Sequence, residues 1–434
     1  MKIKENALKN IRLKSLFTNR IAGAWGEEPD QLNATICIRA ADFDTDKIKH
    51  KETDLTRRAY KPEEINTRAL KNGDIIIEKS GGGDNQPVGR VVLFSLEEPA
   101  MCSNFLEILR PNKKLLDSKF GAWLLYSLWS SRAVIPAIKQ TTGIQNLDLE
   151  TYLDCKVNIP QIEEQESITG FLDDQVGKID ALISAKESLL LLLEEKYQAF
   201  ITHVVTHGLT TPEFIFDSGI KEIGNIPKHW TITRLKFVAE IRGGLTIGKN
   251  YKDKKLESYP YLRVANVQDG KLDLTEMKEV LIPKKEAELY FLQEGDVLMN
   301  EGGDADKLGR GCIWMNEVSP CLHQNHVFAV RPRKVTPQWL NLWTSSDIAK
   351  AYFESRAKQS TNLASISSSS IKELYIPLPP RQEQLEIVEW TEKQRKRSES
   401  LSEATKSSIS LLKERRKALI LAAVTGQIIT PTEV

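Results

Sequence analysis

Apolar residues recur at spacings of four and three over a long stretch in the middle of the chain. Only Lys186 interrupts the series, and no proline falls between Gln161 and Thr211. About 45 helical residues at ~1.5 Å each give a rod of roughly 65–70 Å, and so long a seam is typical of a coiled coil. We therefore expect a long helix over about 161–208, with a helix–helix seam formed by Leu172, Val176, Ile179, Ile183, Leu190, Leu193, Tyr197, Phe200 and Val204.

A second long helix is predicted near the end of the chain, where residues 381–428 contain no proline. Its apolar seam is thinner and consists of Leu401, Ala404, Ser408, Leu411, Ala418 and Ala422. Residues 161–210 carry 9 acidic and 3 basic side chains, whereas residues 381–430 carry 7 acidic and 10 basic ones. Opposite net charges predict that the two helices pair with each other. The alternative, two ordinary surface helices with solvated charge, fits their length and seam less well.

Strand and helix patterns alternate in the blocks that precede the two long helices. Turns entering buried strands are predicted at 73–77 and 295–299, further strands at 88–94 and 326–330, and helices at 120–130 and 339–353. A proline-bearing segment stands before each long helix, at 159–160 and at 376–380, which is a typical helix entry. Each block is therefore predicted to be a mixed α and β domain.

An internal repeat with a very long period organises the chain. Ala199, Ile201, Val205 and Thr206 recur 219 positions later as Ala418, Ile420, Val424 and Thr425, and Gln140, Thr142 and Glu164-Gln165 recur as Gln359, Thr361 and Glu383-Gln384. With small drifts in the offset, Arg12-Leu13-Lys14, Arg39, Gly73-Asp74, Gly89-Arg90, Asn104 and Arg110-Pro111 match Arg234-Leu235-Lys236, Arg263, Gly295-Asp296, Gly309-Arg310, Asn325 and Arg331-Pro332. Because these matches occur in the same order, we conclude that the sequence contains two copies of one unit.

The repeat predicts four segments: a first block at 1–160, a helical spacer at 161–208, a second block at 209–380, and a second spacer with a C-terminal tail at 381–434. The expected fold class is α+β, with two similar mixed α/β domains separated by two long helices. If these helices form an antiparallel coiled coil, the two blocks are related by a pseudo-twofold axis.

The amino-acid composition changes little in this predicted domain organisation. The 434 residues include 60 Lys and Arg and 59 Asp and Glu, so the net charge of +1 lacks the basic footprint of a small stand-alone DNA-binding domain. Segregated charge still permits nucleic-acid binding. Five scattered cysteines predict reduced thiols in a cytoplasmic protein, and no run of 18 apolar residues predicts a membrane span. The polar start of the chain has no signal-peptide pattern.

Catalytic signatures are missing from the sequence. Neither a P-loop nor a GxGxxG after a strand is present, so we expect no nucleotide site. Cys321, His323 and His326 have a suggestive spacing but lack further ligands, and His203 and His207 form a pair with no third partner, so we expect no metal site. No nucleophile–base–acid set can be nominated from the spacing. The chain is therefore predicted to have no catalytic residues and to serve in recognition or assembly.

Two similar blocks held apart by a pair of long helices would have approximate twofold symmetry, and the DNA backbone has twofold symmetry as well. Each block is then expected to read one half-site, and the target is bipartite and asymmetric because the blocks differ in sequence. Arginine can read guanine, and asparagine or glutamine can read adenine, so polar residues of the glycine-bearing and Gln/Thr-rich loops are the candidates. They are Arg39, Lys79, Ser80, Arg90, Thr141, Thr142, Gln145 and Asn146 in the first block, and Arg263, Asn300, Glu301, Lys307, Arg310, Gln359, Ser360, Thr361 and Asn362 in the second.

Four motifs resemble one known family over essentially the whole chain. They are Ile223-Gly224-x-Ile226-Pro227-x-His229-Trp230, Gly295-Asp296-Val297-Leu298, Ile376-Pro377-Leu378-Pro379-Pro380-x-Gln382-Glu383-Gln384, and the ending Arg415-Arg416-Lys417-Ala418-Leu419-Ile420 through Ala423-Val424-Thr425-Gly426. With the duplication, they are similar to the specificity subunit of type I restriction-modification systems. The first block departs from the pattern in lacking the Ile-Pro-x-x-Trp opening, and His207 stands where Gly426 does.

The resemblance implies a non-catalytic subunit with two target-recognition domains and two helical spacers. It implies binding to double-stranded DNA, to two methyltransferase subunits that hold S-adenosylmethionine and methylate adenine, and to restriction subunits that translocate and cleave DNA with ATP. Both cofactors would then belong to the partners. The alternatives are a recognition subunit of another methylation-only or defence complex, a stand-alone nuclease or methyltransferase, and a coiled-coil scaffold without DNA binding.

Overall fold

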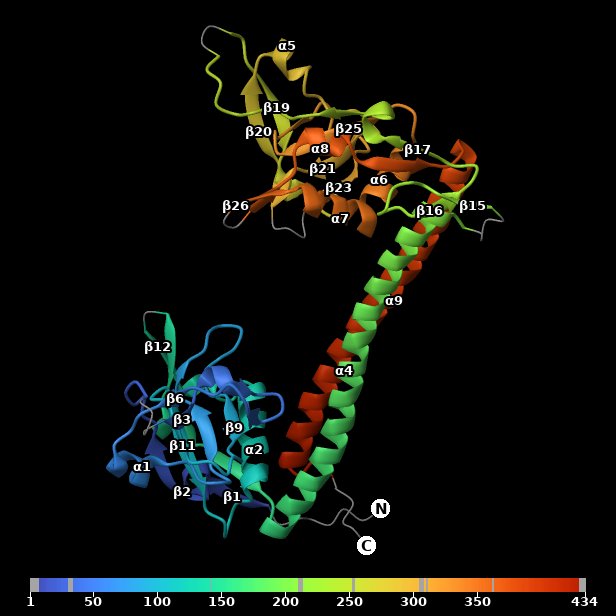
Figure 1. Ribbon diagram of the computed structural model, residues 1–434. Helices are drawn as coiled ribbons and strands as arrows, with labels where there is room; N and C mark the ends of the chain where they lie inside the picture. Colours follow the sequence, from blue (N-terminus) through green and yellow to red (C-terminus); the bar gives the residue numbers. More distant parts are fainter. Residues whose placement is uncertain are drawn as a thin grey trace. The chain divides into compact units, whose positions relative to one another are not determined.

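A computed structural model describes residues 8–29, 34–141, 143–209, 214–251, 254–303, 308–309, 311–360 and 363–428. The chain divides into two compact units (Figure 1). The first unit comprises Met1–Glu187 and Lys406–Val434, and the second comprises Ser188–Thr405. Each unit therefore contains one globular block together with part of each long helix.

The two long helices are α4 (Ile162–His207) and α9 (Arg381–Val424). Acidic residues in the first turn of α4, among them Glu164, complement the positive end of the helix dipole. Both helices end shortly before a glycine in the left-handed region, Gly208 with φ +80° and Gly426 with φ +72°. A glycine of this conformation is the commonest way for a helix to end.

The first block consists of short strands and helices. Its four-stranded antiparallel sheet has the order β2-β11-β7-β9, with β2 at Phe17–Ala22, β11 at Leu106–Pro111, β7 at Ile75–Glu78 and β9 at Val91–Leu93. Two three-stranded sheets are β10 (Ala100–Cys102), β3 (Thr35–Ile38) and β6 (Arg57–Arg58), and β12 (Ile138–Thr141), β13 (Ile144–Leu147) and β8 (Ser80–Gly81). Strand β1 (Lys9–Arg12) pairs with β14 (Lys156–Ile159), and β4 (Phe43–Asp44) pairs with β5 (Lys49–His50). The helices are α1 (Pro62–Arg68), α2 (Ser118–Ser130) and α3 (Leu149–Leu153), with 3-10 turns η1 (Leu13–Leu16), η2 (Ala40–Asp42) and η3 (Ile135–Ala137).

The second block repeats this construction. Its four-stranded sheet has the order β18-β25-β21-β23, with β18 at Ala239–Arg242, β25 at Val327–Pro332, β21 at Val297–Asn300 and β23 at Gly311–Ile313. The three-stranded sheets are β20 (Lys278–Ile282), β19 (Glu257–Leu262) and β24 (Leu322–His323), and β22 (Gly302–Gly303), β27 (Leu363–Ser365) and β26 (Lys358–Ser360). Strand β17 (Thr231–Arg234) pairs with β28 (Tyr375–Leu378), and β15 (Ile215–Asp217) pairs with β16 (Asn225–Pro227). The helices are α5 (Lys284–Ala287), α6 (Pro337–Thr344), α7 (Asp347–Arg356) and α8 (Ser368–Lys372), with turns η4 (Leu235–Phe237) and η5 (Val264–Asn266).

An ion pair between an arginine and a buried aspartate occurs at the same place in both blocks. The Arg110 guanidinium donates two hydrogen bonds to Asp74, at 2.8 and 2.7 Å. The Arg331 guanidinium does the same to Asp296, with both distances 2.7 Å. Each aspartate follows a glycine of positive φ, Gly73 or Gly295, that turns the chain into a buried strand. The Gly-Asp and Arg-Pro matches of the repeat therefore mark a buried contact.

A second repeated contact joins each block to its long helix. The Gln165 side chain of α4 accepts the main-chain N–H of Asp117, the N-cap of α2, at 2.9 Å. The Gln384 side chain of α9 accepts the main-chain N–H of Thr336, the N-cap of α6, at 3.2 Å. These amides are buried, so the Glu-Gln match of the repeat fixes where each helix meets its block.

One helix prediction is wrong in extent. The expected helix at 339–353 is two helices, α6 and α7, separated at Ser345 and Ser346. The hydroxyl of Ser346 accepts the main-chain N–H of Ala349 at 3.3 Å and caps α7. A serine at this position favours a new helix start over continuation of the previous one. The strand expected at 88–94 is likewise shorter and forms only β9.

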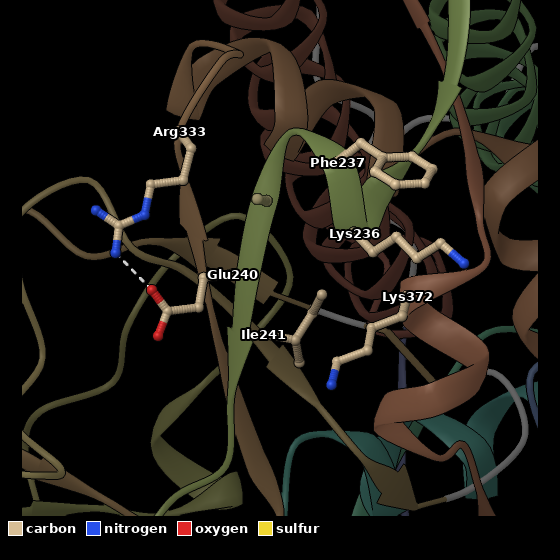
Figure 2. Close-up of a pocket in the computed structure, with 7 residues that line it drawn as sticks. Lys236, Phe237, Glu240, Ile241, Arg333 and Lys372 are labelled. Atoms are coloured by element: carbon tan, nitrogen blue, oxygen red, sulfur yellow. Dashed lines mark hydrogen bonds and ion pairs between the residues drawn. The ribbon is translucent and has the colours of Figure 1, made fainter.

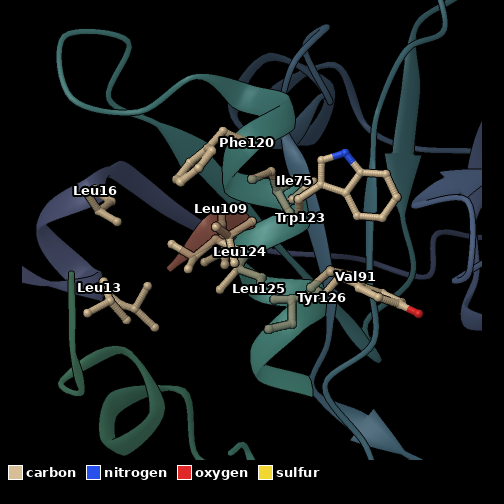
Figure 3. Packing of buried hydrophobic residues seen from close by; sticks show 14 of the residues in the cluster. Leu13, Leu16, Ile75, Val91, Leu109, Phe120, Trp123, Leu124, Leu125 and Tyr126 are labelled. Carbon is tan, nitrogen blue, oxygen red and sulfur yellow. The ribbon is translucent and has the colours of Figure 1, made fainter. Parts of the chain in front are cut away.

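The core of the first unit lies between its central sheet and α2 (Figure 3). Phe120 and Leu124 of α2 pack with Ile75 and Leu109 of the sheet, and all four side chains are buried. The same cluster also includes Leu172, Val176, Ile420 and Val424 from the two long helices. The first block and the adjoining parts of α4 and α9 therefore share one core.

The seam predicted for α4 is buried to different degrees along its length. Leu172, Val176, Ile179, Ile183 and Val204 are buried, whereas Leu190, Leu193, Tyr197 and Phe200 are half-buried. Two leucines next to this seam, Leu191 and Leu192, are among the exposed side chains.

The seam predicted for α9 is in the wrong register. Leu401, Ala404, Leu411 and Ala418 are exposed, and Ser408 and Ala422 are half-buried. Between residues 401 and 424, the buried positions are instead Thr405, Ile409, Arg416, Ile420, Ala423 and Val424. Two polar residues on this face explain the error, because the Thr405 hydroxyl donates to the Leu401 carbonyl oxygen and Arg416 is paired with Asp180.

Side-chain contacts join the two helices within each unit. In the first unit, Arg416 pairs with Asp180 at 2.7 Å and Lys413 pairs with Glu187 at 3.3 Å. The Arg416 guanidinium also donates to the Tyr126 hydroxyl at 3.0 Å and contacts the main-chain carbonyl of Asp46. In the second unit, the rings of Phe200 and Trp390 lie 4.5 Å apart. Among the described residues, no helix is long and apolar enough to cross a membrane.

Truncation of the α4 seam is expected to destabilise the first unit. Leu172→Ala removes a fully buried side chain, so we expect the free energy of unfolding to fall by about 2–5 kcal/mol. Leu182→Ala, in the same unit and at a side chain that is 47% exposed, is the matched control and should change this free energy by only about 0.5 kcal/mol. Hydrogen exchange of peptides from α2 and α4 measures both effects, and equal exchange in the two variants would contradict the assignment of the seam.

Candidate nucleic-acid interface

Most described candidate residues of the first block gather around one hairpin. Strand β8 pairs with β13, which places Ser80 opposite Asn146 and Gly81 opposite Gln145. Strand β12, which ends at Thr141, completes this sheet, and Figure 1 shows it standing out from the rest of the block. Thr142 lies outside the described residues. The glycine-bearing loop and the Gln/Thr-rich loop are therefore neighbours, as a shared binding surface requires.

The polar side chains of this hairpin differ in exposure. Asn146 is exposed, and its Oδ1 accepts a hydrogen bond from the Ser80 hydroxyl at 2.7 Å. Gln145 is only 6% exposed, and its Oε1 accepts the main-chain N–H of Val88 at 3.1 Å. The prediction that Gln145 contacts a base does not fit this geometry, because its amide is turned into the block. The Gln145 amide instead connects the hairpin to the main chain at Val88.

The basic candidates of the first block are paired with carboxylates. Arg90 donates two hydrogen bonds of 2.8 Å to Glu78. Arg39 pairs with Asp42 at 3.1 Å within the turn η2. The Lys79 ammonium lies 3.8 Å from a Glu107 carboxylate oxygen. These cations remain partly accessible, but each would have to share its hydrogen bonds between the protein and DNA.

The candidates of the second block gather in the corresponding way. Strand β22 pairs with β27, which pairs with β26, so Asn300 and Glu301 lead into the sheet that contains Gln359 and Ser360. Four other candidates, Lys307, Arg310, Thr361 and Asn362, lie outside the described residues. The repeated loops thus come together in each unit separately.

The geometry of Asn300 does not fit the predicted base contact either. Its side chain is 4% exposed, and its Nδ2 donates to the main-chain oxygen of Val267 at 2.9 Å. A buried amide held in this way supports the loop and cannot reach a base without leaving its site. Arg263 is half-exposed and donates to the main-chain oxygen of Glu276 at 2.9 Å. It starts the turn η5, as Arg39 starts η2 in the first block.

Both units hold their candidate loops with the same pair of main-chain hydrogen bonds. The N–H of Lys79 donates to the carbonyl oxygen of Phe105 at 2.9 Å, and the carbonyl oxygen of Lys79 accepts from Leu147 at 2.9 Å. In the second unit, the corresponding bonds join Glu301 to His326 at 2.9 Å and Ile366 to Glu301 at 2.8 Å. We call this arrangement the main-chain clamp.

The clamp includes two exposed residues that the sequence did not indicate as DNA contacts. They are Phe105 in the first unit and His326 in the second. A signal for them was present, since each directly follows a matched asparagine of the repeat, Asn104 or Asn325. The two copies therefore agree at the asparagine and differ at the exposed residue that follows it.

A hollow of about 410 Å³ lies in the second unit beside β18 (Figure 2). Its lining consists of Lys236, Phe237, Ala239, Glu240, Ile241, Arg333 and Lys372. Arg333 pairs with Glu240 at 2.5 Å. The lining residues carry three cations, Lys236, Arg333 and Lys372, and one carboxylate, Glu240. The hollow is therefore lined by an excess of positive charge.

The side chains of Cys321, His323 and His326 each have a hydrogen-bond partner within the protein. His323 is buried, and its Nδ1–H donates to the main-chain oxygen of Val327 at 2.7 Å. His326 instead pairs with Glu301, and the thiol of Cys321 contacts a main-chain oxygen. The rings of His203 and His207 stack at 5.0 Å on α4. Within the described part of the chain, no group of three or more His, Cys, Asp or Glu side chains could hold a metal ion.

Burial of His323 predicts a specific pH dependence. Desolvation lowers the pKa of His323 to about 4, whereas an unfolded chain titrates this group near 6.5. The unfolded state therefore binds the proton first as the pH falls, and the second unit should lose up to about 3 kcal/mol of stability between pH 6.5 and 4. Denaturant unfolding at several pH values measures this loss. His323→Asn, which keeps a donor without a titrating ring, should flatten the curve over that range, and an unchanged slope would contradict the prediction.

Two copies of one mixed α/β block hold equivalent loops with the same main-chain clamp but with different side chains, which is the construction of a duplicated recognition protein. A comparison with known families agrees. The model of the type I restriction modification DNA specificity domain matches residues 54–191 and 227–415, and the chain belongs to this family. The two matched ranges fall in the two copies of the repeat.

Individual relatives support the assignment. The chain is 22% identical to the EcoKI specificity subunit of Escherichia coli strain K12 over 392 residues, which cover 88% of this chain and 81% of the relative. It is 34% identical over 170 residues to a putative MjaX specificity subunit of Methanocaldococcus jannaschii, covering 38% of this chain and 39% of that protein.

Two solved structures share the fold. A chain from a type I restriction-modification system structure aligns over 99% of this chain and all of its own length, with a TM-score of 0.72 and 17% identity. The HsdS subunit from Thermoanaerobacter tengcongensis aligns over 99% of both chains, with a TM-score of 0.56 and 17% identity. With the family assignment, the chain is a DNA-specificity subunit whose role is recognition and not catalysis.

Proposed function

We propose that each unit of this chain reads one half of a bipartite, asymmetric DNA site within a type I restriction-modification complex. The observation that carries the proposal is the main-chain clamp, which occurs in both units but presents different side chains in each. The same construction with different side chains would place two different readers in equivalent positions. An asymmetric target follows, because the exposed loop residues differ between the units.

The proposed contact surface is narrower than the set of polar loop residues. Exposed or half-exposed candidates remain: Arg39, Lys79, Ser80, Arg90 and Asn146 in the first unit, and Arg263 and Glu301 in the second. The buried amides of Gln145 and Asn300 are proposed to support these loops. The candidates outside the described residues, and Thr141, Gln359 and Ser360, remain proposals from the sequence.

The long helices are proposed to set the distance between the half-sites as an antiparallel coiled coil with a pseudo-twofold axis. In the first unit, positions 180 and 187 of α4 pair with positions 416 and 413 of α9, so the partners run in opposite directions. In the second unit, Phe200 meets Trp390 near the start of α9. The opposite net charges of the two helices support the same pairing.

The partners are proposed from the family. EcoKI is named as a type I restriction enzyme, of which the relative is the specificity subunit. By analogy, we propose that this chain docks two methyltransferase subunits on its helices and that restriction subunits join the complex. S-adenosylmethionine and ATP would bind to those partners. The complex would act in the cytoplasm, where its DNA target lies.

The proposal is tested by single-molecule methylation sequencing of cells with and without this gene. We expect a bipartite motif with methylated adenines that disappears when the gene is removed. The proposal fails if methylation is unchanged while the partner subunits are expressed and the complex assembles. A coiled-coil scaffold without DNA binding would then be favoured.

A further inference from the structure

The residue that accepts the first hydrogen bond of the clamp occupies the same place in both units but has different chemistry. Phe105 accepts from Lys79, and His326 accepts from Glu301, with 2.9 Å in each case. Both acceptors are exposed, and each follows a matched asparagine of the repeat. Because the main chain is fixed in the same way, the two side chains project from equivalent points of their blocks.

In the first unit, this point presents an apolar ring beside polar loop residues. The Phe105 side chain is 50% exposed, and its carbonyl oxygen also accepts the N–H of Ser80 at 3.2 Å. The hydroxyl of Ser80 in turn bonds to exposed Asn146. An exposed phenyl ring has no partner in water, whereas a thymine methyl group in the major groove offers an apolar contact.

In the second unit, the same point presents the His326 ring, which is hydrogen-bonded to the Glu301 carboxylate across the clamp. The Nδ1 of His326 lies 2.6 Å from a carboxylate oxygen of Glu301, and both side chains remain accessible to solvent. A carboxylate on a DNA-binding surface is repelled by phosphates, so it is useful only opposite a hydrogen-bond donor. The amino group of cytosine is the base donor that Glu or Asp reads in the major groove.

We propose that the side chains of the two residues joined by the first hydrogen bond of the clamp determine base specificity in both halves of the target. Phe105 contacts the methyl group of a thymine in the first half-site. Glu301 accepts a hydrogen bond from the amino group of a cytosine in the second, and His326 is a positioning residue that orients the Glu301 carboxylate. The inference rests on the proposed function and deepens it by naming the bases.

The test uses the full chain assembled with its methyltransferase subunits and a library of duplexes randomised at each base of the methylated motif. Glu301→Gln is expected to lower the preference for cytosine at one second-half position about tenfold or more and to favour adenine there, because glutamine reads adenine. Phe105→Ala is expected to lower the preference for thymine at one first-half position several-fold. Each variant is the control for the other, since neither should alter the opposite half.

Several outcomes would overturn the inference. One is an unchanged base preference in both variants, and another is a loss of affinity that is equal for all bases, which would indicate a structural role. His326→Asn is a second variant that leaves Glu301 in place, and it should weaken the cytosine preference without replacing it. Failure of the wild-type complex to select any motif would instead count against the proposed function itself.

Discussion

Replacing Arg331 by methionine is expected to lower the free energy of unfolding of the second unit by about 3–5 kcal/mol. The Asp296 carboxylate is completely buried, and the Arg331 side chain is 8% exposed. Two hydrogen bonds of 2.7 Å join them, and the bond to Asp296 raises the pKa of Arg331. Methionine fills a similar volume but leaves Asp296 as an uncompensated buried charge, which is the costly outcome.

Arg333→Met is the matched control for this variant. Arg333 lies two residues further along the chain and pairs with Glu240, but its side chain is 57% exposed. Such a surface pair contributes about 0–1 kcal/mol, so its loss should be nearly silent. Arg110→Met in the first unit should have an intermediate effect, because that arginine is more exposed than Arg331. Hydrogen exchange of β21 and β25 distinguishes these cases, and equal protection in Arg331→Met and Arg333→Met would contradict the argument.

Exchanging residues 1–160 for the corresponding block of another family member should replace one half of the methylated motif and leave the other half unchanged. Each mismatched base pair costs a DNA-binding protein about 1–3 kcal/mol, so several changed bases should reduce binding to the original site by about a hundredfold or more. Methylation sequencing of cells with the hybrid chain reads both halves at once. A change in both halves would contradict independent reading.

The hybrid chain can fold only if the new block packs against the two long helices. The first block shares its core with the two long helices, through contacts such as those of Leu172 and Ile420. The donor block must therefore present a compatible apolar face from its own α2. If a hybrid fails to assemble, the control is a second hybrid in which several of these core contacts with the long helices are restored.

Much of the fold follows from the sequence, because the repeat and the spacing of apolar residues report directly on burial. The strands after Gly73 and Gly295 and the long proline-free helices have strong local patterns. The seam of α9 could not be found in this way, because buried Arg416 and Thr405 interrupt its apolar face and are satisfied by partners far along the chain or by the helix itself. Apolar periodicity detects neither arrangement.

The candidate site was only partly predictable for a related reason. Polar loop residues can be selected from composition, but their orientation depends on contacts between distant segments. Gln145 is turned inward by residue 88, and Asn300 by residue 267. Phe105 escaped selection because an apolar residue in a loop is ordinarily assigned to the core. Its exposure becomes evident only once the strands are paired.

The main-chain clamp has a consequence for how such a protein evolves. Its hydrogen bonds are made by peptide groups, which are the same for every residue except proline at the donor positions. Substitutions at Phe105, Glu301 or His326 therefore change the chemistry of the surface with little effect on the fold. New surface chemistries can therefore arise by single substitutions while the chain stays folded. Under the proposed function, base specificity could change in this way while the main-chain hydrogen bonds that support the loops stay the same.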